Sequence, residues 1–304
     1  MKKEVTIKNR VSCSGIGLHT GCRSRIIFHP APGGTGIVFL KKSSKKIRYI
    51  KASVYYVVST ELATTVGSNG DFIGTVEHLL AAVRGLNIDN LFIEVQGDEI
   101  PILDGSSKVF VELIESSGFC YCDTPKKKFM LKKKIVWGDI KRWIKAYPAT
   151  GFKVDYIIDF AHPMIGQQRY SYNHSRYEFK QQIAPARTFG FLKDVCRLKE
   201  MGLALGGSLD NAVVFDENKI LNPEGLRFVD EPVRHKILDF MGDLSLIGGC
   251  LEGYFQVYCS GHAFNASFVK YLLNYRSEYL DIALLTRDKR VQKTETPGEA
   301  VLAN

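Results

Sequence analysis

The sequence predicts an α+β fold of two similar domains, each a β-sheet with a helical layer, packed helix layer against helix layer as a β-α-α-β sandwich. Three observations favour it. The 304 residues suffice for two domains with their own cores. Both halves show the order strands, helix, strand, helix. Between them, Asp123-Thr-Pro125 and a lysine run interrupt the pattern. No repeat of residues is present, so the duplication rests on element order alone.

In the first half, alternating apolar residues predict strands, and 3.6-residue spacing predicts helices. The predicted strands are 4–8, 24–28, 36–40 and 90–95, and the helices begin at 75 and 108 and end near 85 and 116. Thr75 is the expected N-cap of the first helix. The glycine-rich stretch 14–21 is interpreted as a turn, because it is not a GxGxxG motif between a strand and a helix.

The second half repeats this plan. The predicted strands are 129–131, 143–147, 152–160 and 253–258, and the helices are 233–244 and 263–273. A less regular block, 183–230, is rich in glycine and apolar residues and is interpreted as an insert that lines a site. The expected division is an N-terminal domain at 1–124, a C-terminal domain at 125–287 and a polar tail at 288–304.

Composition is typical of a soluble globular protein, with 45% hydrophobic residues. The first residues, 1–10, are basic but have no apolar segment after them, so they do not resemble a secretory signal. No apolar run approaches the roughly 18 residues of a membrane span. The seven cysteines are scattered and odd in number, which fits a reducing compartment and small buried side chains better than a disulfide framework. We expect a cytoplasmic protein.

The formal net charge of +9 favours an anionic partner: nucleic acid, a phosphorylated small molecule or an anionic membrane surface. Lysine and arginine concentrate at 41–48 and 126–134. Neither run has the interleaved aromatic residues of a nucleic-acid platform, so both are interpreted as mainly solvated loops and strand edges. A basic nucleic-acid-binding protein stays as an alternative.

The predicted helix 233–244 carries polar residues on one ridge. His235, Asp239 and Asp243 stand four residues apart, so they share a face. A second helix start, at 75–83, places Glu77 beside His78. If His78 meets His235 and Asp239, the three form a metal site with an open coordination position, which is the catalytic pattern for zinc. The alternative is that the ridge is an ordinary solvated helix face.

Such a site favours hydrolysis, because a metal activates water and Glu77 can accept the proton. A second possibility keeps the site but loads iron(II), since two histidines and a carboxylate also describe non-haem oxygenases. His262, which follows a predicted strand, is a candidate general acid; its alternative is a turn histidine that caps a carbonyl.

Nine motifs, in order, resemble those of the zinc-dependent UDP-3-O-acyl-N-acetylglucosamine deacetylases of lipid A (lipopolysaccharide) synthesis in Gram-negative bacteria. They are GIGLHTG (15–21), TVEH (75–78), EIPILDGS (99–106), ARTFGF (186–191), LGGS (205–208), LRF (226–228), VRHKILD (233–239), GDL (242–244) and SGH (260–262). The resemblance implies removal of acetate from the amide of that UDP-sugar, with one Zn²⁺ per chain or Fe²⁺ in its place. It also implies one insert in each domain.

The resemblance also assigns roles. His78, His235 and Asp239 match the zinc ligands. Glu77 matches the general base, His262 the acid, Asp243 the carboxylate that orients this acid, and Thr188 the hydroxyl that holds the oxyanion. Lys236, Phe160, Arg142 and Phe191 match contacts of the UDP-sugar, and Lys236 also belongs to the catalytic group.

An apolar passage for the acyl chain is implied within the insert at about 190–215 and beside it. Its residues are Leu18, Phe189, Val195, Ala204, Ser208, Leu209, Ala212 and Val214. Ala204 and Leu209 depart from the larger or sulfur-containing residues expected there, and 60–65 lacks a cysteine present in some members. The expected partner is a small UDP-sugar lipid, without nucleic acid or an integral membrane segment, and the expected chain is a monomer.

Overall fold

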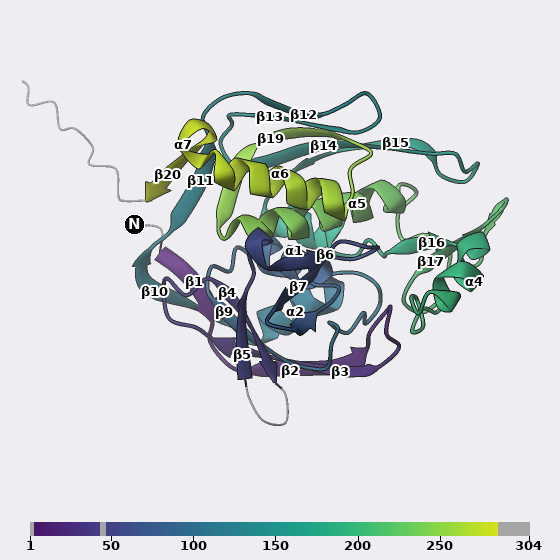
Figure 1. Cartoon of the computed structure of the whole chain (residues 1–304), viewed down its shortest axis with the longest axis horizontal. Coiled ribbons are helices and arrows are strands. Elements are labelled where there is room, and N and C mark those ends of the chain that lie inside the picture. Colours follow the sequence, from purple (N-terminus) through teal and green to yellow (C-terminus); the bar gives the residue numbers. More distant parts are fainter. Residues whose placement is uncertain (1–2, 43–46, 285–304) are drawn as a thin grey trace, which may run out of the picture.

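The computed structural model describes residues 3–42 and 47–284 (Figure 1). The predicted tail at 288–304 lies outside them, as does part of the first lysine run, 43–46. The chain is mixed α+β, as predicted. Within the described ranges, no helix has the length and apolar character needed to cross a membrane.

The main sheet of the first half has five strands in the order β2-β3-β9-β4-β5, with β9 at its centre. Its strands are β2 (Val11–Ile16), β3 (Arg23–Pro30), β4 (Ile37–Lys42), β5 (Ile47–Lys51) and β9 (Leu91–Gln96). A smaller sheet holds β6 (Val57–Ser59), β7 (Thr65–Ser68) and β8 (Asp71–Ile73), and β1 (Lys3–Ile7) pairs with β10 (Phe119–Pro125). The helices of this half are η1 (Val54–Tyr56), α1 (Glu77–Gly85) and α2 (Lys108–Ser116).

The main sheet of the second half has seven strands, and β19 (Cys250–Tyr258) lies at its centre. The others are β11 (Lys127–Leu131), β12 (Ile135–Gly138), β13 (Trp143–Tyr147), β14 (Phe152–Phe160), β15 (Gly166–Asn173) and β20 (Leu280–Leu284). Helices α5 (Glu231–Leu244), η3 (Ser245–Ile247), α6 (His262–Asn274) and α7 (Arg276–Tyr279) complete this half. The two halves share one feature of order. In the first half α1 precedes the central strand β9, which pairs in parallel with β4. In the second half α5 precedes the central strand β19, which pairs in parallel with β14.

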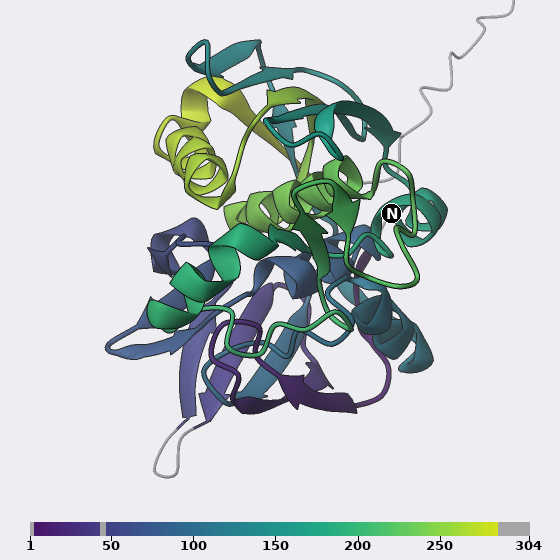
Figure 2. The ribbon, with the colours of Figure 1, turned by 90° about the vertical axis from the view of Figure 1, so that its right-hand side faces the viewer.

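The block predicted as an irregular insert has some regular structure. It follows α3 (Arg176–Glu178) and the π-helical turn η2 (Phe179–Ile183), and contains β16 (Phe189–Phe191), α4 (Leu192–Glu200), β17 (Val213–Asp216) and β18 (Lys219–Ile220). Strands β16, β17 and β18 form a small sheet. Figure 1 shows α4 beside this sheet at the side of the molecule, and Figure 2 shows it facing the viewer; α4 has no buried residue.

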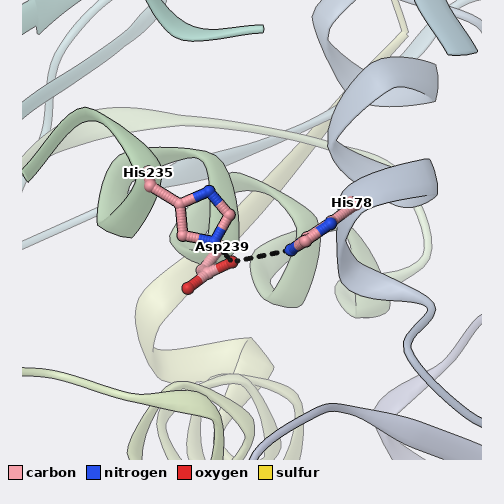
Figure 3. A group of neighbouring side chains, drawn as sticks. All are labelled: His78, His235 and Asp239. Carbon is pink, nitrogen blue, oxygen red and sulfur yellow. Dashed lines mark ion pairs between the residues drawn. The ribbon is translucent and has the colours of Figure 1, made fainter. Parts of the chain in front are cut away.

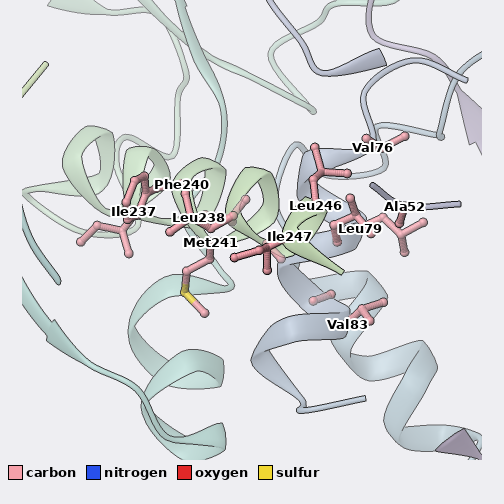
Figure 4. Close-up of a cluster of buried hydrophobic side chains, with 14 of the residues drawn as sticks. Ala52, Val76, Leu79, Val83, Ile237, Leu238, Phe240, Met241, Leu246 and Ile247 are labelled. Carbon is pink, nitrogen blue, oxygen red and sulfur yellow. The ribbon is translucent and has the colours of Figure 1, made fainter. Parts of the chain in front are cut away.

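Helices α1, α5 and α6 lie between the two main sheets (Figure 1). Apolar residues of α1 and α5 form the core between them, as Figure 4 shows. Leu79 and Val83 of α1, and Ile237 and Leu238 of α5, are each at most 2% exposed. This packing fixes the first turn of α1 against the polar ridge of α5.

Gly242 permits the close approach of these helices. A Cβ atom at this position would lie 2.1 Å from the carbonyl oxygen of Glu77. Helix propensity alone predicts that Gly242→Ala stabilises α5 by up to about 1 kcal/mol. We expect the reverse, a loss of about 1–3 kcal/mol of unfolding free energy, because the added methyl forces the helices apart. Denaturant unfolding checks this, with Gly190→Ala as the control, since a Cβ there meets no atom within 4 Å.

Several predictions of local structure are wrong. Thr75 is not the N-cap of α1: the N-cap is Val76, and Thr75 has a positive φ of 55°. Its hydroxyl donates instead to the Glu99 carboxylate, 2.7 Å away. Only the second part of the glycine-rich stretch is a turn, because Ser14 to Ile16 pair with β3.

Most lysines of the two runs that the structure describes are exposed, as predicted. Two are not: Lys41 is 7% exposed and Lys126 is 8% exposed. Burial is tolerated because each ammonium has a carboxylate partner, Asp98 for Lys41 and Asp89 for Lys126.

The cysteines also differ from the prediction. All seven are free thiols, in agreement with the absence of a predicted disulfide framework. However, Cys250 alone among them is buried, while Cys22, Cys120 and Cys196 are exposed. Cys120 lies on β10, Cys196 lies on α4, and Cys22 directly precedes β3. The sequence around these three has no apolar pattern that would bury them.

Candidate metal centre and active site

Two helices bring the three predicted metal ligands together (Figure 3). His78 lies on the first turn of α1, and His235 and Asp239 lie one turn apart on α5. Their ligand atoms all lie within 4.8 Å of one another, and all three residues are buried. Asp239 Oδ1 is 3.6 Å from His78 Nε2 and 3.3 Å from His235 Nε2. The two imidazole rings are perpendicular, with centroids 4.9 Å apart.

The surroundings of these atoms fit a metal. His235 Nδ1 is 3.1 Å from the carbonyl oxygen of Ala186, so Nδ1 carries the proton and Nε2 offers its lone pair. Asp239 Oδ1 is buried without a hydrogen-bond partner among the described residues, whereas Oδ2 accepts from Lys236 Nζ at 2.7 Å. Burial lowers the pKa of His235 to about 3, against the opposing effect of Asp239. The imidazole is therefore neutral and able to ligate.

Glu77 and His262 lie beside the three ligands. Glu77 is 2% exposed, and its Oε2 accepts from the backbone N–H of Thr64 at 2.9 Å. Its Oε1 is 4.0 Å from His262 Nε2. Burial raises the pKa of the Glu77 carboxyl. This glutamate is consequently a stronger base than an exposed one.

Asp243 orients His262 from the next turn of α5. Its Oδ2 lies 2.9 Å from His262 Nδ1 and accepts from the side-chain amide of Asn265 at 2.8 Å. Its Oδ1 accepts from the Thr64 hydroxyl at 2.6 Å. Burial opposes protonation of His262, but the charges of Asp243 and Glu77 outweigh it and raise the pKa of His262 to about 9. His262 is therefore a proton donor at neutral pH.

Thr188 lies in the loop that passes over His235. Its N–H donates to the Gly105 carbonyl at 2.8 Å. The preceding residue, Arg187, is 2% exposed and is held by Glu231, with Nε–Oε1 at 2.9 Å. The pair ties the loop to the first turn of α5, so Ala186 and Thr188 keep their place relative to His235.

Sequence reasoning missed the buried residues that hold this site. Glu99 is 2% exposed and accepts from the backbone N–H groups of His19 and Thr20, at 2.9 and 2.8 Å. It also holds Thr75, two residues before Glu77. Both ring nitrogens of His19 are buried without a hydrogen-bond partner in the described chain, and burial lowers its pKa. Glu99 and His19 both lie in family motifs, 99–106 and 15–21, but the motifs do not indicate that the two segments contact each other.

Two of the residues predicted to contact UDP, Phe160 and Phe191, belong to an aromatic cluster. Phe160, at the end of β14, lies with its ring centroid 5.6 Å from that of Phe189 and 5.8 Å from that of Phe191. Phe189 is in turn 6.3 Å from the His235 ring, which connects this aromatic cluster to the ligand group. Arg142 is exposed in the β12–β13 turn, where its backbone N–H donates to Asp139.

The residues predicted to line an acyl passage lie around the insert. The carbonyl oxygen of Leu18 accepts from the N–H of Gly206 at 3.0 Å, so the 15–21 segment contacts the 204–208 loop. Ala204 has a positive φ of 54° in that loop. Leu209 is 38% exposed, and Ser208 is also exposed. Phe189, Val195, Ala212 and Val214 are half-buried on β16, α4, β17 and the segment before it.

This mixed α+β fold, with two histidines and a carboxylate beside a buried glutamate and a charged histidine, is that of a metal-dependent hydrolase. The family model described as UDP-3-O-acyl N-acetylglycosamine deacetylase (LpxC) matches residues 4–274. The chain therefore belongs to this family of metalloenzymes, as the sequence motifs predicted.

Curated relatives agree with this assignment. A UDP-3-O-acyl-N-acetylglucosamine deacetylase of Oleidesulfovibrio alaskensis is 47% identical over 293 residues, which cover 96% of this chain and 93% of the relative. A protein of the same name from Nitratidesulfovibrio vulgaris is 47% identical, over 91% of this chain and 90% of the relative. Another, from Myxococcus xanthus, is 46% identical, over 90% of this chain and 87% of the relative.

Proposed function

We propose that this chain hydrolyses the N-acetyl group of UDP-3-O-acyl-N-acetylglucosamine, giving UDP-3-O-acyl-glucosamine and acetate for lipid A synthesis. Membership of the deacetylase family supports the substrate. The observation that carries the reaction is the group of His78, His235 and Asp239, whose ligand atoms lie within 4.8 Å of one another. Glu77 and His262 beside it provide a base and an acid.

We assign the metal as zinc, which His78 Nε2, His235 Nε2 and Asp239 Oδ1 would hold. Two imidazole nitrogens and one carboxylate oxygen are a donor set typical of catalytic zinc sites. When bound, zinc supplies Lewis-acid chemistry, which polarises the amide carbonyl and makes water more acidic. Iron(II) is the alternative for the same ligands.

The chain's own residues move the protons. Glu77 takes a proton from the attacking water, since burial makes its carboxylate more basic. His262, held by Asp243, gives its Nε2 proton to the leaving nitrogen as the C–N bond breaks. The Thr188 hydroxyl donates to the oxyanion that forms from the carbonyl. Water and amide thereby become acetate and a free amine.

We place the UDP group along Phe160, Phe191, Lys236 and Arg142, with the ring of Phe160 on uracil and the cations on the diphosphate. The acyl chain follows the apolar side chains of the insert. Leu192, Met201, Leu205 and Leu209 are 38–54% exposed there, and such apolar surface favours contact with an alkyl chain.

We propose that the chain divides near residue 124 into two α+β domains that pack helix layer on helix layer, with the insert at about 190–215 in the second. The same order in each half, helix then central strand with a parallel partner, supports a duplication. We further propose a monomer in the cytoplasm, where UDP-sugars are available.

Product analysis tests the reaction. The metal-loaded protein is incubated with the UDP-sugar lipid, and the products are identified by mass spectrometry. We expect free acetate and a product smaller by C₂H₂O that retains both its acyl chain and UDP. Release of the fatty acid or of UMP instead would show ester or diphosphate cleavage and would exclude the proposed amidase.

The pH dependence tests the role of Asp243. His262 has its pKa raised to about 9, so the protonated acid persists at neutral pH and is lost as pH rises through this value. The rate should therefore fall on the alkaline side near pH 9. In Asp243→Asn this alkaline limb should move to lower pH, because the carboxylate that raises the pKa is gone. A pH–rate profile of kcat/KM checks this, and an unmoved limb would contradict the role.

A further inference from the structure

A cavity of about 620 Å³ lies at the seam between β1 and β10 on one side and β11, β14 and β19 on the other, at the opposite end of α1 from His78. We call it the seam cavity; its lining includes Arg84, Lys126, Lys128, His174, Arg176 and Glu252. Arg84 lies on the last turn of α1, seven residues after Glu77, which corresponds to about 10 Å along the helix. No role in the proposed hydrolysis uses this cavity.

The lining of the seam cavity is strongly basic. It contains three lysines and two arginines but a single carboxylate, Glu252. Each lysine has an acidic partner: Lys3 pairs with Asp123, Lys126 with Asp89, and Lys128 with Glu252. Two positive charges, both guanidinium groups, are left over.

Neither guanidinium has a carboxylate partner within the ranges 3–42 and 47–284. Arg84 donates to the side-chain oxygen of Asn87 and the carbonyl of Leu251, both at 3.1 Å. Arg176 lies over the ring of Phe119, 4.8 Å from its centroid. Guanidinium groups bind phosphate through two parallel N–H bonds, and their planar shape orients the anion.

His174 adds a neutral donor. Its Nδ1 lies 2.8 Å from the Tyr172 hydroxyl, and its Nε2 is buried without a hydrogen-bond partner in the part of the chain that the structure describes. Burial, together with the smaller effects of Arg84, Arg176 and Lys126 in the same direction, lowers the pKa of His174 to about 3. The ring is thus neutral in a positive field. When Tyr172 donates to Nδ1, Nε2 carries a proton that an anion can accept.

We propose that the seam cavity is a second anion site, which binds the phosphate group of a small molecule between Arg84 and Arg176 with His174 Nε2 as a further donor. The two unpaired positive charges match a phosphate dianion. The volume of about 620 Å³ also accommodates a group larger than phosphate itself. The site does not depend on the proposed deacetylation.

Site-resolved NMR tests this proposal on the metal-loaded full chain. The arginine Nε–Hε signals of Arg84 and Arg176 are followed while inorganic phosphate, and separately a hexose 6-phosphate, are added. We expect both signals to shift together and saturate with one anion per cavity. Tighter binding of the ester would identify a phosphorylated metabolite as the ligand, and equal binding would identify free phosphate; both support the site.

Variants separate this cavity from the substrate site. Arg176→Gln and Arg84→Gln should each weaken phosphate binding in the cavity by about tenfold or more, since each removes a charge-assisted pair. Arg176→Lys should lose less. The control is Arg10→Gln, an exposed arginine outside the cavity. Signals that do not move at millimolar phosphate, or affinities unchanged in both glutamine variants, would overturn the proposal.

Discussion

Glu77→Gln is expected to lower kcat by about 10²- to 10⁴-fold, the usual loss when a general base is removed. The change keeps the size of the side chain and its acceptor for the Thr64 N–H, but it removes the basic carboxylate. Because Glu77 is not among the three ligands, metal content should stay at one ion per chain. Steady-state kinetics with metal analysis of the same sample measures both.

The matched control is Glu115→Gln, a carboxylate on α2 that pairs with Lys180 away from the site. It should leave kcat unchanged. A Glu77→Gln enzyme with near-normal kcat and full metal would remove Glu77 from the mechanism, whereas loss of the metal would make it a ligand.

Asp239→Asn is expected to lose the metal and with it all measurable deacetylation. Asp239 provides the only carboxylate of the ligand group and lies within 3.6 Å of both histidine Nε2 atoms. A neutral amide attracts a dication far less, and Lys236 Nζ, 2.7 Å from Oδ2, then adds an uncompensated positive charge beside the site. Elemental analysis after dialysis measures the metal.

Asp210→Asn serves as the comparison, because Asp210 is exposed in the insert and belongs to no ligand group within the described residues. It should keep its metal. Full occupancy in Asp239→Asn would show that the ion is held elsewhere.

The part of the site that one helix determines could be predicted from the sequence. His235, Asp239 and Asp243 share a ridge because of the helical repeat, and they do so in α5. His78 is different, because its distance to Asp239 depends on how α1 packs on α5. That packing rests on Gly242 at the carbonyl of Glu77, a contact that no local pattern encodes. The assignment of His78 to the ligand group therefore came from the family resemblance.

The supporting residues were missed because their partners are distant in sequence. Thr64 bonds Asp243, 179 residues later, and Arg187 bonds Glu231, 44 residues later. Hydroxyl and guanidinium groups carry no periodic signal that would show such pairs. Strand β15 was not predicted either, because its sequence, GQQRYSYN, is polar and has no apolar alternation. It pairs with β14, and most of its residues lie at the surface.

Hydrolysis of the acetamide is expected to require zinc held by His78, His235 and Asp239. The decisive measurement is acetate release from UDP-3-O-acyl-N-acetylglucosamine after chelation and again after addition of one equivalent of zinc. We expect chelation to abolish the activity of the natural chain and zinc to restore it, while Asp239→Asn stays inactive. Full activity in the chelated protein, or zinc-dependent activity in Asp239→Asn, would contradict the claim.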